Sequence, residues 1–186
     1  MPDLKEQLKE LQELAAQMEK KLPEVQALFL PILDCLQKGR TLFSCGNGGS
    51  ATDALHIAEE LVGRYRGDRV ALPAVCLNAD VSAMTCIAND WSFERIYSRQ
   101  LEALGRPGDV LVAFSTSGNS ANIIEALKMA RERGMISILL TGKDGGLGLA
   151  LADHTVIVPS ANTARIQEIH TWILHVILEE VEAAFI

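Results

Sequence analysis

Two short loops rich in glycine and serine contain residues whose types and spacing suit the binding of an anion. Residues 46–50 read Gly-Asn-Gly-Gly-Ser, follow the apolar run 41–45 and open a helical pattern. Residues 115–120 read Ser-Thr-Ser-Gly-Asn-Ser and follow the apolar run 110–114. A strand that ends in such a loop at a helix start directs unpaired backbone N–H groups and the positive end of the helix dipole toward one point. Two such loops predict a site for a phosphorylated small molecule.

Each loop also has a purely structural interpretation. The first lacks the spacing of a dinucleotide fingerprint and the lysine of a P-loop, and its glycines could simply supply a positive φ in a tight turn. The hydroxyls of the second could cap a helix. An N-cap needs one hydroxyl, however, whereas Ser115, Thr116, Ser117 and Ser120 supply four. The second loop therefore favours a phosphate site that uses no lysine.

His56 and Glu60 stand four residues apart after the first loop, so a helix would place them on one face directed toward the anion site. Together they could bind a metal or form a base with its partner. Taken alone, His56 would more often be a hydrogen-bonded core histidine, and Glu60 a surface acid or the partner of Arg64. Glu59 is adjacent to Glu60, and only the alignment with His56 favours Glu60 as the inward carboxylate.

The last helical segment, 161–184, repeats this theme with Gln167, Glu168, His170 and His175 among apolar residues. The two histidines are five residues apart and cannot both share a narrow helix face, so at most one of them is expected in the site. A histidine on a largely apolar helix is more often structural. The spacing does not decide between the two.

Short apolar runs alternate with helical segments along the part of the chain that would position these residues. The runs lie at 41–45, 72–77, 110–114, 136–141 and 154–158, and the helical segments at 49–66, 80–104, 119–133 and 161–184. This alternation predicts a three-layer α/β/α fold with a five-stranded parallel sheet covered on both faces. Ligands of such open sheets bind beyond the carboxyl ends of the strands, where both loops lie.

Two helices are expected before the sheet. Apolar residues recur at helical spacing from Leu4 to Met18, which predicts an amphipathic arm, and a second helix is expected from Pro23 to Lys38 with a kink or break at Pro31. We expect residues 1–38 to form a helical oligomerisation arm and residues 39–186 to form one α/β domain.

Composition narrows the class of protein. The 186 residues correspond to about one domain, and the net charge of −7 argues against nucleic acid as a direct partner. The N-terminus is charged where a signal peptide would be apolar, and no apolar run reaches membrane-spanning length, so a cytoplasmic protein is expected. The cysteines are Cys35, Cys45, Cys76 and Cys86. They lie apart in apolar surroundings and are expected to be buried reduced thiols, with no disulfide and no cysteine metal site.

In its motifs the sequence resembles the phosphoheptose isomerases (sedoheptulose 7-phosphate isomerases) of the sugar-isomerase (SIS) domain superfamily. The matching segments are CGNGGS at 45–50, HIAEELVGRYR at 56–66, IAND at 87–90, FSTSGNS at 114–120, LTGKDGG at 140–146 and ARIQEIH at 164–170, followed by His175. The resemblance runs from about residue 5 to the C-terminus. Several motifs in the same order make it specific, where any one of them would be weak.

The resemblance implies a flavodoxin-like SIS domain over 39–186 and an enzyme that converts D-sedoheptulose 7-phosphate to D-glycero-D-manno-heptose 7-phosphate through an enediol. This is the first step of nucleotide-activated (ADP-)heptose biosynthesis for lipopolysaccharide. It also implies a homotetramer with sites between subunits and one zinc ion per subunit. The implied substrate contacts are Asn47, Gly48, Gly49, Ser50, Glu60, Asn89, Asp90, Ser115, Thr116, Ser117, Ser120 and Gln167. The implied zinc ligands are His56, Glu60, Gln167 and His175, which selects His175 over His170.

Interconversion of a ketose and an aldose through an enediol needs a base beside the carbonyl, an acid that moves protons between oxygens, and stabilisation of the enediolate. Glu60 is the expected base and His175 the expected acid, with zinc or nearby dipoles polarising the carbonyl. A Glu60 permanently bound to zinc would be less basic, so a structural or transient metal is the alternative. Gln167 and His175 are separated by roughly 12 Å of helix rise, which is long for two ligands of one zinc ion. Ligands from different subunits would remove this difficulty.

The sequence departs from some relatives at two places. They have His-Cys after the first serine and an Asp before Arg-Ile-Gln, where this chain has Ala51-Thr52 and Ala164. Any contact or proton relay that this Asp supplies is absent here, and the linker 160–163 could substitute for it in part.

Two other functions compete with catalysis. One is a non-enzymatic relative that uses the same tetrameric fold to bind the bacterial replication initiator; in that branch the counterparts of Glu60 and His175 are not both kept, whereas this chain has both. The other is a sugar-phosphate-sensing regulatory domain. Such domains usually carry a DNA-binding segment, for which the N-terminal arm is too short.

Overall fold

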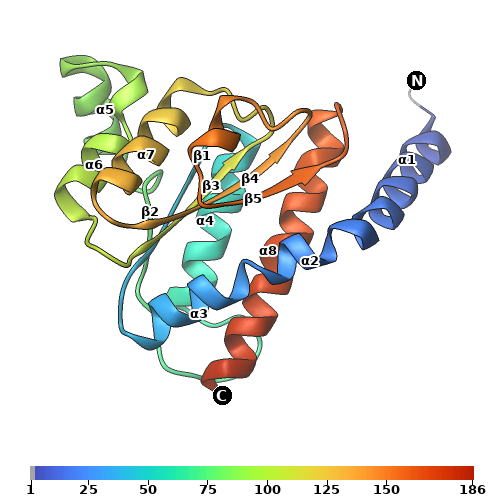
Figure 1. Ribbon diagram of the computed structural model, residues 1–186, viewed down its shortest axis with the longest axis horizontal. Coiled ribbons are helices and arrows are strands. Elements are labelled where there is room, and N and C mark those ends of the chain that lie inside the picture. The colour runs from blue at the N-terminus through green and yellow to red at the C-terminus, as the bar shows by residue number, and fades with distance from the viewer. Residues whose placement is uncertain (1–2) are drawn as a thin grey trace.

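The computed structural model describes residues 3–186, and its centre is a sheet of five parallel strands in the order β2-β1-β3-β4-β5 (Figure 1). The strands are β1 (Leu42–Gly46), β2 (Ala74–Cys76), β3 (Val110–Ser115), β4 (Ile136–Gly142) and β5 (His154–Val158). The predicted five-stranded parallel sheet is thus confirmed. Within residues 3–186, no helix is both long and apolar enough to cross a membrane.

Helices cover both faces of the sheet, and the alternation of strand residues divides the core in two. Val110, Val112 and Phe114 of β3 face α3 (Phe29–Gln37), α4 (Gly49–Val62) and α8 (Thr163–Phe185). Leu111 and Ala113 face the opposite layer, formed by α6 (Ser98–Leu104) and α7 (Ala121–Glu132). Strands buried on both faces read as continuous apolar runs, which is why the sequence reveals them.

The sheet register places the two loops side by side. β1 pairs with β3 so that Gly46 lies opposite Phe114, and Ser115 at the end of β3 lies opposite Thr141 of β4. The carboxyl ends of β1 and β3 therefore meet at the same edge. The loops that follow them must open over one shared space.

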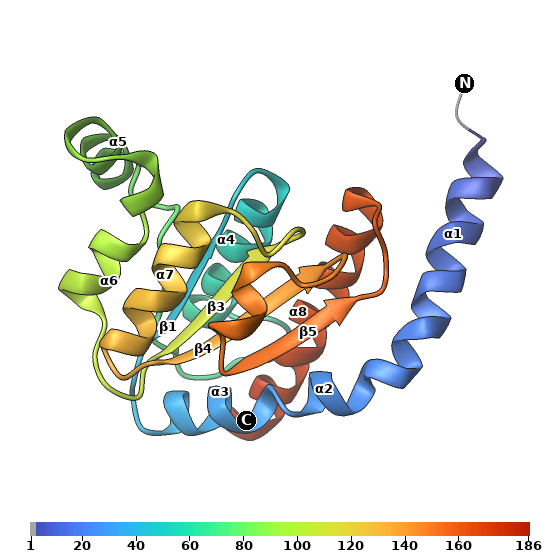
Figure 2. The same cartoon turned by 45° about the horizontal axis from the view of Figure 1, so that its top comes forward.

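Four helical segments precede the sheet: α1 (Leu4–Gln17), the 3₁₀ turn η1 (Met18–Lys21), α2 (Leu22–Gln26) and α3. The predicted arm is confirmed as a helix, and α1 extends away from the body of the molecule (Figure 2). The predicted break at Pro31 lies instead at residues 27–28. Pro31 falls in the first turn of α3, where its missing N–H has no intrahelical partner to lose.

The single helix predicted over 80–104 is wrong. The chain forms α5 (Val81–Asp90), a 3₁₀ turn η2 (Phe93–Arg95) and α6, because the backbone leaves the helical region at Trp91 and is extended at Ser92. These bends allow Ile96, Tyr97 and Leu101 to enter the core. A further 3₁₀ turn, η3 (Leu147–Ala150), precedes β5.

The helix predicted over 49–66 also ends early, at Val62, and an irregular segment continues to β2. This segment is held by Glu182 of α8, whose carboxylate accepts the backbone N–H groups of Arg66 and Gly67, both at 2.8 Å. These bonds satisfy the loop backbone in place of further helical turns.

The expectation of four buried thiols holds for three cysteines. Cys35, Cys45 and Cys76 are buried, and burial raises the pKa of the Cys35 thiol to about 11. Cys86 is exposed, because it lies on a face of α5 that the core does not cover. All four are free thiols.

Candidate active site

A pocket of about 220 Å³ lies where the two loops meet, and we refer to it as the cradle. It is lined by Asn47, Gly48, Gly49, Ser50, Phe114, Ser115, Thr116, Ser120, Thr163 and Gln167. The N-termini of α4 and α7 both open toward it, since Gly49 begins α4 and Ser120 is the N-cap residue of α7. None of its lining residues is a lysine or an arginine.

Glycine is required at two places in the first loop. Gly48 has a φ of +57°, which side chains rarely adopt. A Cβ at Gly49 would lie 2.7 Å from the Gln167 amide, so glycine lets the α8 side chain approach the start of α4. The loop thus exposes main-chain groups while Gln167 closes one side of the cradle.

The hydroxyls of the second loop are not all used in the same way. Ser120 occupies the N-cap position of α7 without making a side-chain capping bond, so ordinary N-capping does not explain it. Ser115 Oγ accepts the Gly118 N–H at 3.1 Å. Ser117 Oγ accepts the Asn119 N–H at 3.2 Å, and Ser117 does not line the cradle. Its role as a substrate contact stays a prediction.

Thr163 is a lining residue that the sequence did not single out by itself. It begins α8 immediately before Ala164, the position where some relatives have an Asp. Asn162 caps the helix, since its Oδ1 accepts the Ala164 N–H at 3.1 Å. The linker 160–163 therefore brings one hydroxyl to the cradle.

A seam of polar side chains runs down from the cradle between α4 and α8, which start at the same edge of the sheet and lie side by side (Figure 1). We call it the polar seam. From the cradle downward, its pairs are Gly49 with Gln167, Asp53 with Thr171, and His56 with His175. Because the partners advance together by three or four residues, the two helices remain in register along the whole seam.

The lower end of the seam contains the residues expected to do chemistry. The rings of His56 and His175 have centroids 5.1 Å apart and are nearly perpendicular. His56 Nε2 lies 3.5 Å from Glu60 Oε1, and the Glu60 side chain is 17% exposed. Glu59 is exposed. The structure therefore agrees that Glu60 shares a face with His56, although the roles of these residues stay predictions.

His170 is placed apart from the seam. It is fully buried, and its Nε2 lies 3.2 Å from the Thr141 carbonyl oxygen. The centroid of its ring lies 6.1 Å from the ring centroid of Phe114. Burial lowers its pKa to about 4, so the ring is neutral and donates to Thr141. This is the structural role that the sequence left open for one of the two histidines.

Asp53 is the polar residue of the seam that sequence analysis missed. It is 7% exposed; its Oδ1 accepts the Thr171 hydroxyl at 2.8 Å, while Oδ2 has no hydrogen-bond partner. Burial raises the pKa of this carboxyl, and the nearby His56 and His175 oppose the rise. Its spacing of three residues before His56 was the available signal.

The remaining predicted contacts are not brought to the cradle within one chain. Asn89 and Asp90 are exposed on α5, where Asn89 Nδ2 donates to Asp90 Oδ1 at 2.8 Å. Neither lines the cradle. Glu60 lies about 16 Å of helix rise below Gly49 on α4. The anion site and the carboxylate–imidazole pair are thus separate regions of the single chain.

One group of side chains could hold a metal ion. His56, Glu59 and Glu60 each offer one ligand atom, and these atoms lie within 4.8 Å of one another. The 3.5 Å between His56 Nε2 and Glu60 Oε1 fits two ligands that are each about 2 Å from one tetrahedral ion. Gln167 lies at the other end of the seam, beside Gly49. The donor set is nitrogen and carboxylate oxygen, which zinc accepts.

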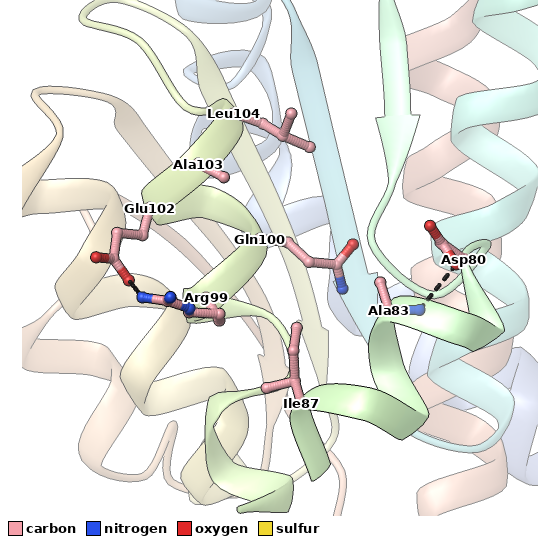
Figure 3. Close-up of a pocket in the computed structure, with 8 residues that line it drawn as sticks. All are labelled: Asp80, Ala83, Ile87, Arg99, Gln100, Glu102, Ala103 and Leu104. Carbon is pink, nitrogen blue, oxygen red and sulfur yellow. Dashed lines mark hydrogen bonds and ion pairs between the residues drawn. The ribbon is translucent and has the colours of Figure 1, made fainter. Parts of the chain in front are cut away.

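A larger pocket of about 470 Å³ lies between α5 and α6 (Figure 3). Its polar side chains are already engaged: Arg99 pairs with Glu102 at 2.8 Å, Asp80 accepts the Ala83 N–H, and the Gln100 amide donates to two backbone carbonyls. The smaller cradle, which residues of both loops line, is therefore the better candidate for binding an anion.

Known proteins resemble this chain over most of its length. The SIS domain family matches residues 6–142. Phosphoheptose isomerase 1 of Campylobacter jejuni is 49% identical over 154 residues, 83% of each chain, and the phosphoheptose isomerase of Paramagnetospirillum magneticum is 51% identical over 158 residues, 85% of this chain and 82% of the relative. The solved structure of phosphoheptose isomerase GmhA from Neisseria gonorrhoeae is 42% identical with a TM-score of 0.91 and covers 97% of both chains. The chain therefore belongs to the SIS domain family and, within it, to the phosphoheptose isomerases.

Proposed function

We propose that this protein isomerises D-sedoheptulose 7-phosphate to D-glycero-D-manno-heptose 7-phosphate through an enediol. The observation that carries the proposal is the cradle, where two helix N-termini and uncommitted hydroxyls converge without a basic side chain. Such a pocket suits a phosphate dianion. The relatives named phosphoheptose isomerase support a heptose phosphate as the ligand. The reaction would begin the synthesis of nucleotide-activated heptose for lipopolysaccharide in the cytoplasm, where the free thiols stay reduced.

In the proposed mechanism the cradle holds the phosphate and the lower end of the seam acts on the carbonyl end of a sugar. Glu60 takes a proton from C1, beside the C2 carbonyl, and His175 moves protons between the two oxygens of the enediol. The protonated Glu60 then returns a proton to C2, which gives the aldose. The His56 and His175 rings are in edge contact, and Glu60 lies beside His56, so the carboxylate and imidazole are held together before substrate arrives. This arrangement reduces the reorganisation that the reaction requires.

We propose that the two halves of the mechanism come from different copies of the chain. About eight bonds separate C1 from phosphorus in the substrate, and an extended chain advances about 3.5 Å per three bonds, so the substrate spans roughly 10 Å. Glu60 lies about 16 Å of helix rise below the cradle, beyond this reach. A second copy would supply Glu60 and His175, and Asn89 and Asp90 on the exposed surface of α5 are available to reach a neighbour's cradle.

The N-terminal residues 1–38 are proposed to be the arm that brings the copies together. Leu4 and Leu8 of α1 are 79% and 57% exposed. Beside them a groove of about 420 Å³ runs between α1 and α8, lined by Leu11, Ala15, Met18, Glu168, Ile169 and Trp172. Exposed leucines next to an apolar groove suit burial against another copy. The proposed assembly is a homotetramer of SIS domains, each formed by residues 39–186.

Zinc is the proposed metal, held by His56, Glu60 and His175 of one copy and Gln167 of another. When bound, it would polarise the carbonyl oxygen of the substrate. Its test is elemental analysis of protein purified without chelator, with His56→Ala as the comparison. We expect stoichiometric zinc in the natural chain and loss of zinc in the variant. A metal-free natural chain that keeps full activity in chelator would overturn this part of the proposal.

A scaffold that binds the replication initiator is not supported. The similar proteins are named isomerases, and the chain brings a carboxylate and two imidazoles together along the seam that begins at the cradle. A scaffold has no chemical need for that arrangement.

The test of the proposed function is an assay with a panel of phosphorylated ketoses, in which the aldose phosphate product is detected. We expect turnover of sedoheptulose 7-phosphate in preference to shorter ketose phosphates. A folded and assembled protein that turns over none of them would refute the isomerase assignment.

A further inference from the structure

A reciprocal pair of amides lies behind the first loop. Asn47 Nδ2 donates to Asn122 Oδ1 at 2.9 Å, and Asn122 Nδ2 donates to Asn47 Oδ1 at 2.8 Å. Asn122 is the second residue of α7 and is 2% exposed. The pair therefore connects the loop after β1 with the helix that follows the second loop, although the two residues are 75 positions apart.

The backbone of the first loop is fixed from behind by Tyr97 and Asn78. The Tyr97 hydroxyl donates to the Gly46 carbonyl and lies 3.3 Å from Asn47 Oδ1. Asn78 accepts the Gly46 N–H at 3.2 Å and donates to the Tyr97 hydroxyl at 2.8 Å. Tyr97 is 1% exposed, and burial raises the pKa of its hydroxyl, which stays protonated as a donor.

These contacts decide what Asn47 can offer to a ligand. A primary amide has two N–H donors and one carbonyl acceptor. In Asn47, Asn122 uses the carbonyl oxygen and one N–H, which leaves one N–H for the cradle that Asn47 lines. A single free N–H recognises an acceptor oxygen, and a sugar phosphate offers hydroxyl, carbonyl and phosphoryl oxygens.

We propose that Asn122 is a positioning residue for substrate binding. Through the reciprocal pair it holds Asn47 as a single N–H donor toward an oxygen of the bound sugar phosphate and keeps the first loop aligned with the second. Of this network, within residues 3–186, Asn47 is the member that lines the cradle, so Asn122 acts on the ligand through Asn47. The choice of sugar phosphate as ligand rests on the proposed function.

The test is a double-mutant cycle with Asn47→Ala, Asn122→Ala and the double variant, measured as kcat and KM for sedoheptulose 7-phosphate. Loss of one oriented hydrogen bond should raise KM about tenfold in each single variant, with a smaller change in kcat. Because Asn122 acts through Asn47, the double variant should be no worse than Asn47→Ala alone. The dissociation constant of the same sugar phosphate, measured by calorimetry, should follow the same pattern.

Ser137→Ala is the matched control. Ser137 is fully buried and its hydroxyl donates to Asp153 at 2.8 Å, but it lies near the start of β4, at the edge of the sheet opposite the cradle. The Ser137→Ala substitution should lower the melting temperature and leave KM unchanged. If Asn122→Ala does not fold, Asn122→Ser takes its place in the cycle.

Additive effects of the two single variants, or an Asn122 variant that loses stability and keeps its KM, would overturn the proposal. A natural chain without turnover would refute the proposed isomerase instead, and the binding cycle would still decide the role of the amide pair.

Discussion

The cradle and the lower end of the polar seam are built in different ways. The cradle is lined by residues of one chain, most of them from two loops at adjacent strand ends. At the lower end of the seam, His56 and Glu60 share a face of α4, and His175 joins them because α8 packs beside α4 in register. The proposed phosphate site is thus built from neighbouring loops, whereas the proposed chemistry depends on packing between helices and between copies.

The largest expected effect comes from Glu60→Gln at the lower seam. Removing the proposed base should lower kcat about 1,000-fold, because general bases contribute typically 10²–10⁴-fold, while KM changes little. Steady-state kinetics measure both constants. Glu59→Gln is the matched control on the adjacent exposed position and should keep its kcat. An active Glu60→Gln enzyme would move the base elsewhere.

The second-largest effect is expected from substitutions in the N-terminal arm. They test whether the cradle of one copy meets the lower seam of another. Leu4→Glu combined with Leu8→Glu places charges where burial against a neighbour is proposed, and we expect dissociation with about 100-fold lower activity at the same chain concentration. Analytical ultracentrifugation and the isomerase assay measure the two effects. Leu147→Glu, on an exposed leucine of η3 outside the arm, serves as the control. A fully active monomer would show that one chain suffices.

A smaller effect is expected in the cradle. Ser120→Ala removes a hydroxyl that makes no capping bond and should raise KM about tenfold with little change in kcat, since it contributes to binding of the phosphate. Ser117→Ala removes a hydroxyl that bonds within its own loop and should change KM less. The reverse order of the two KM values would contradict the described lining of the cradle.

The smallest expected effect is on the pH dependence of the free energy of unfolding, to which the buried His170 contributes. The pKa of His170 is lowered from 6.5 to about 4, so between these pH values the unfolded chain binds a proton that the folded chain does not. The folded chain therefore loses stability as the pH falls below 6.5. At pH 5 its free energy of unfolding should be lower by about 2 kcal/mol than at higher pH. Urea unfolding at pH 7.5 and 5 should show a larger loss for the natural chain than for His170→Gln. Equal losses would contradict the assignment.

Much of the fold follows from local pattern. All five strands appear as apolar runs, of which β1 and β3 are buried along their whole length, and α1 appears as an amphipathic stripe. Burial on both faces of a strand or on one face of a helix sets the period of apolar residues. The single helix predicted over 80–104 was wrong because the apolar residues of this segment do not all face the core. Tyr97 and Leu101 face the core, whereas Trp91 is exposed. Periodicity does not reveal such a division.

Part of the candidate site could also be predicted from local sequence. Most residues of the two loops line one pocket, as their position after adjacent strands indicated. Thr163 was not singled out, and the predicted contact Ser117 is not among the lining residues, because the direction of a side chain within a loop depends on contacts such as that of Asn119 with Ser117. Asp53 was missed because its burial depends on Thr171, which is 118 residues away.

The loops, the strands before them and the helix face shared by His56 and Glu60 could be predicted from the chain alone, since each depends on residues within a few positions of one another. The register of α4 on α8, the separate burial of His170 and the pairing of Asn47 with Asn122 became visible in the folded molecule. Those contacts join distant segments, and their geometry is set by how the helices pack on the sheet rather than by any local preference.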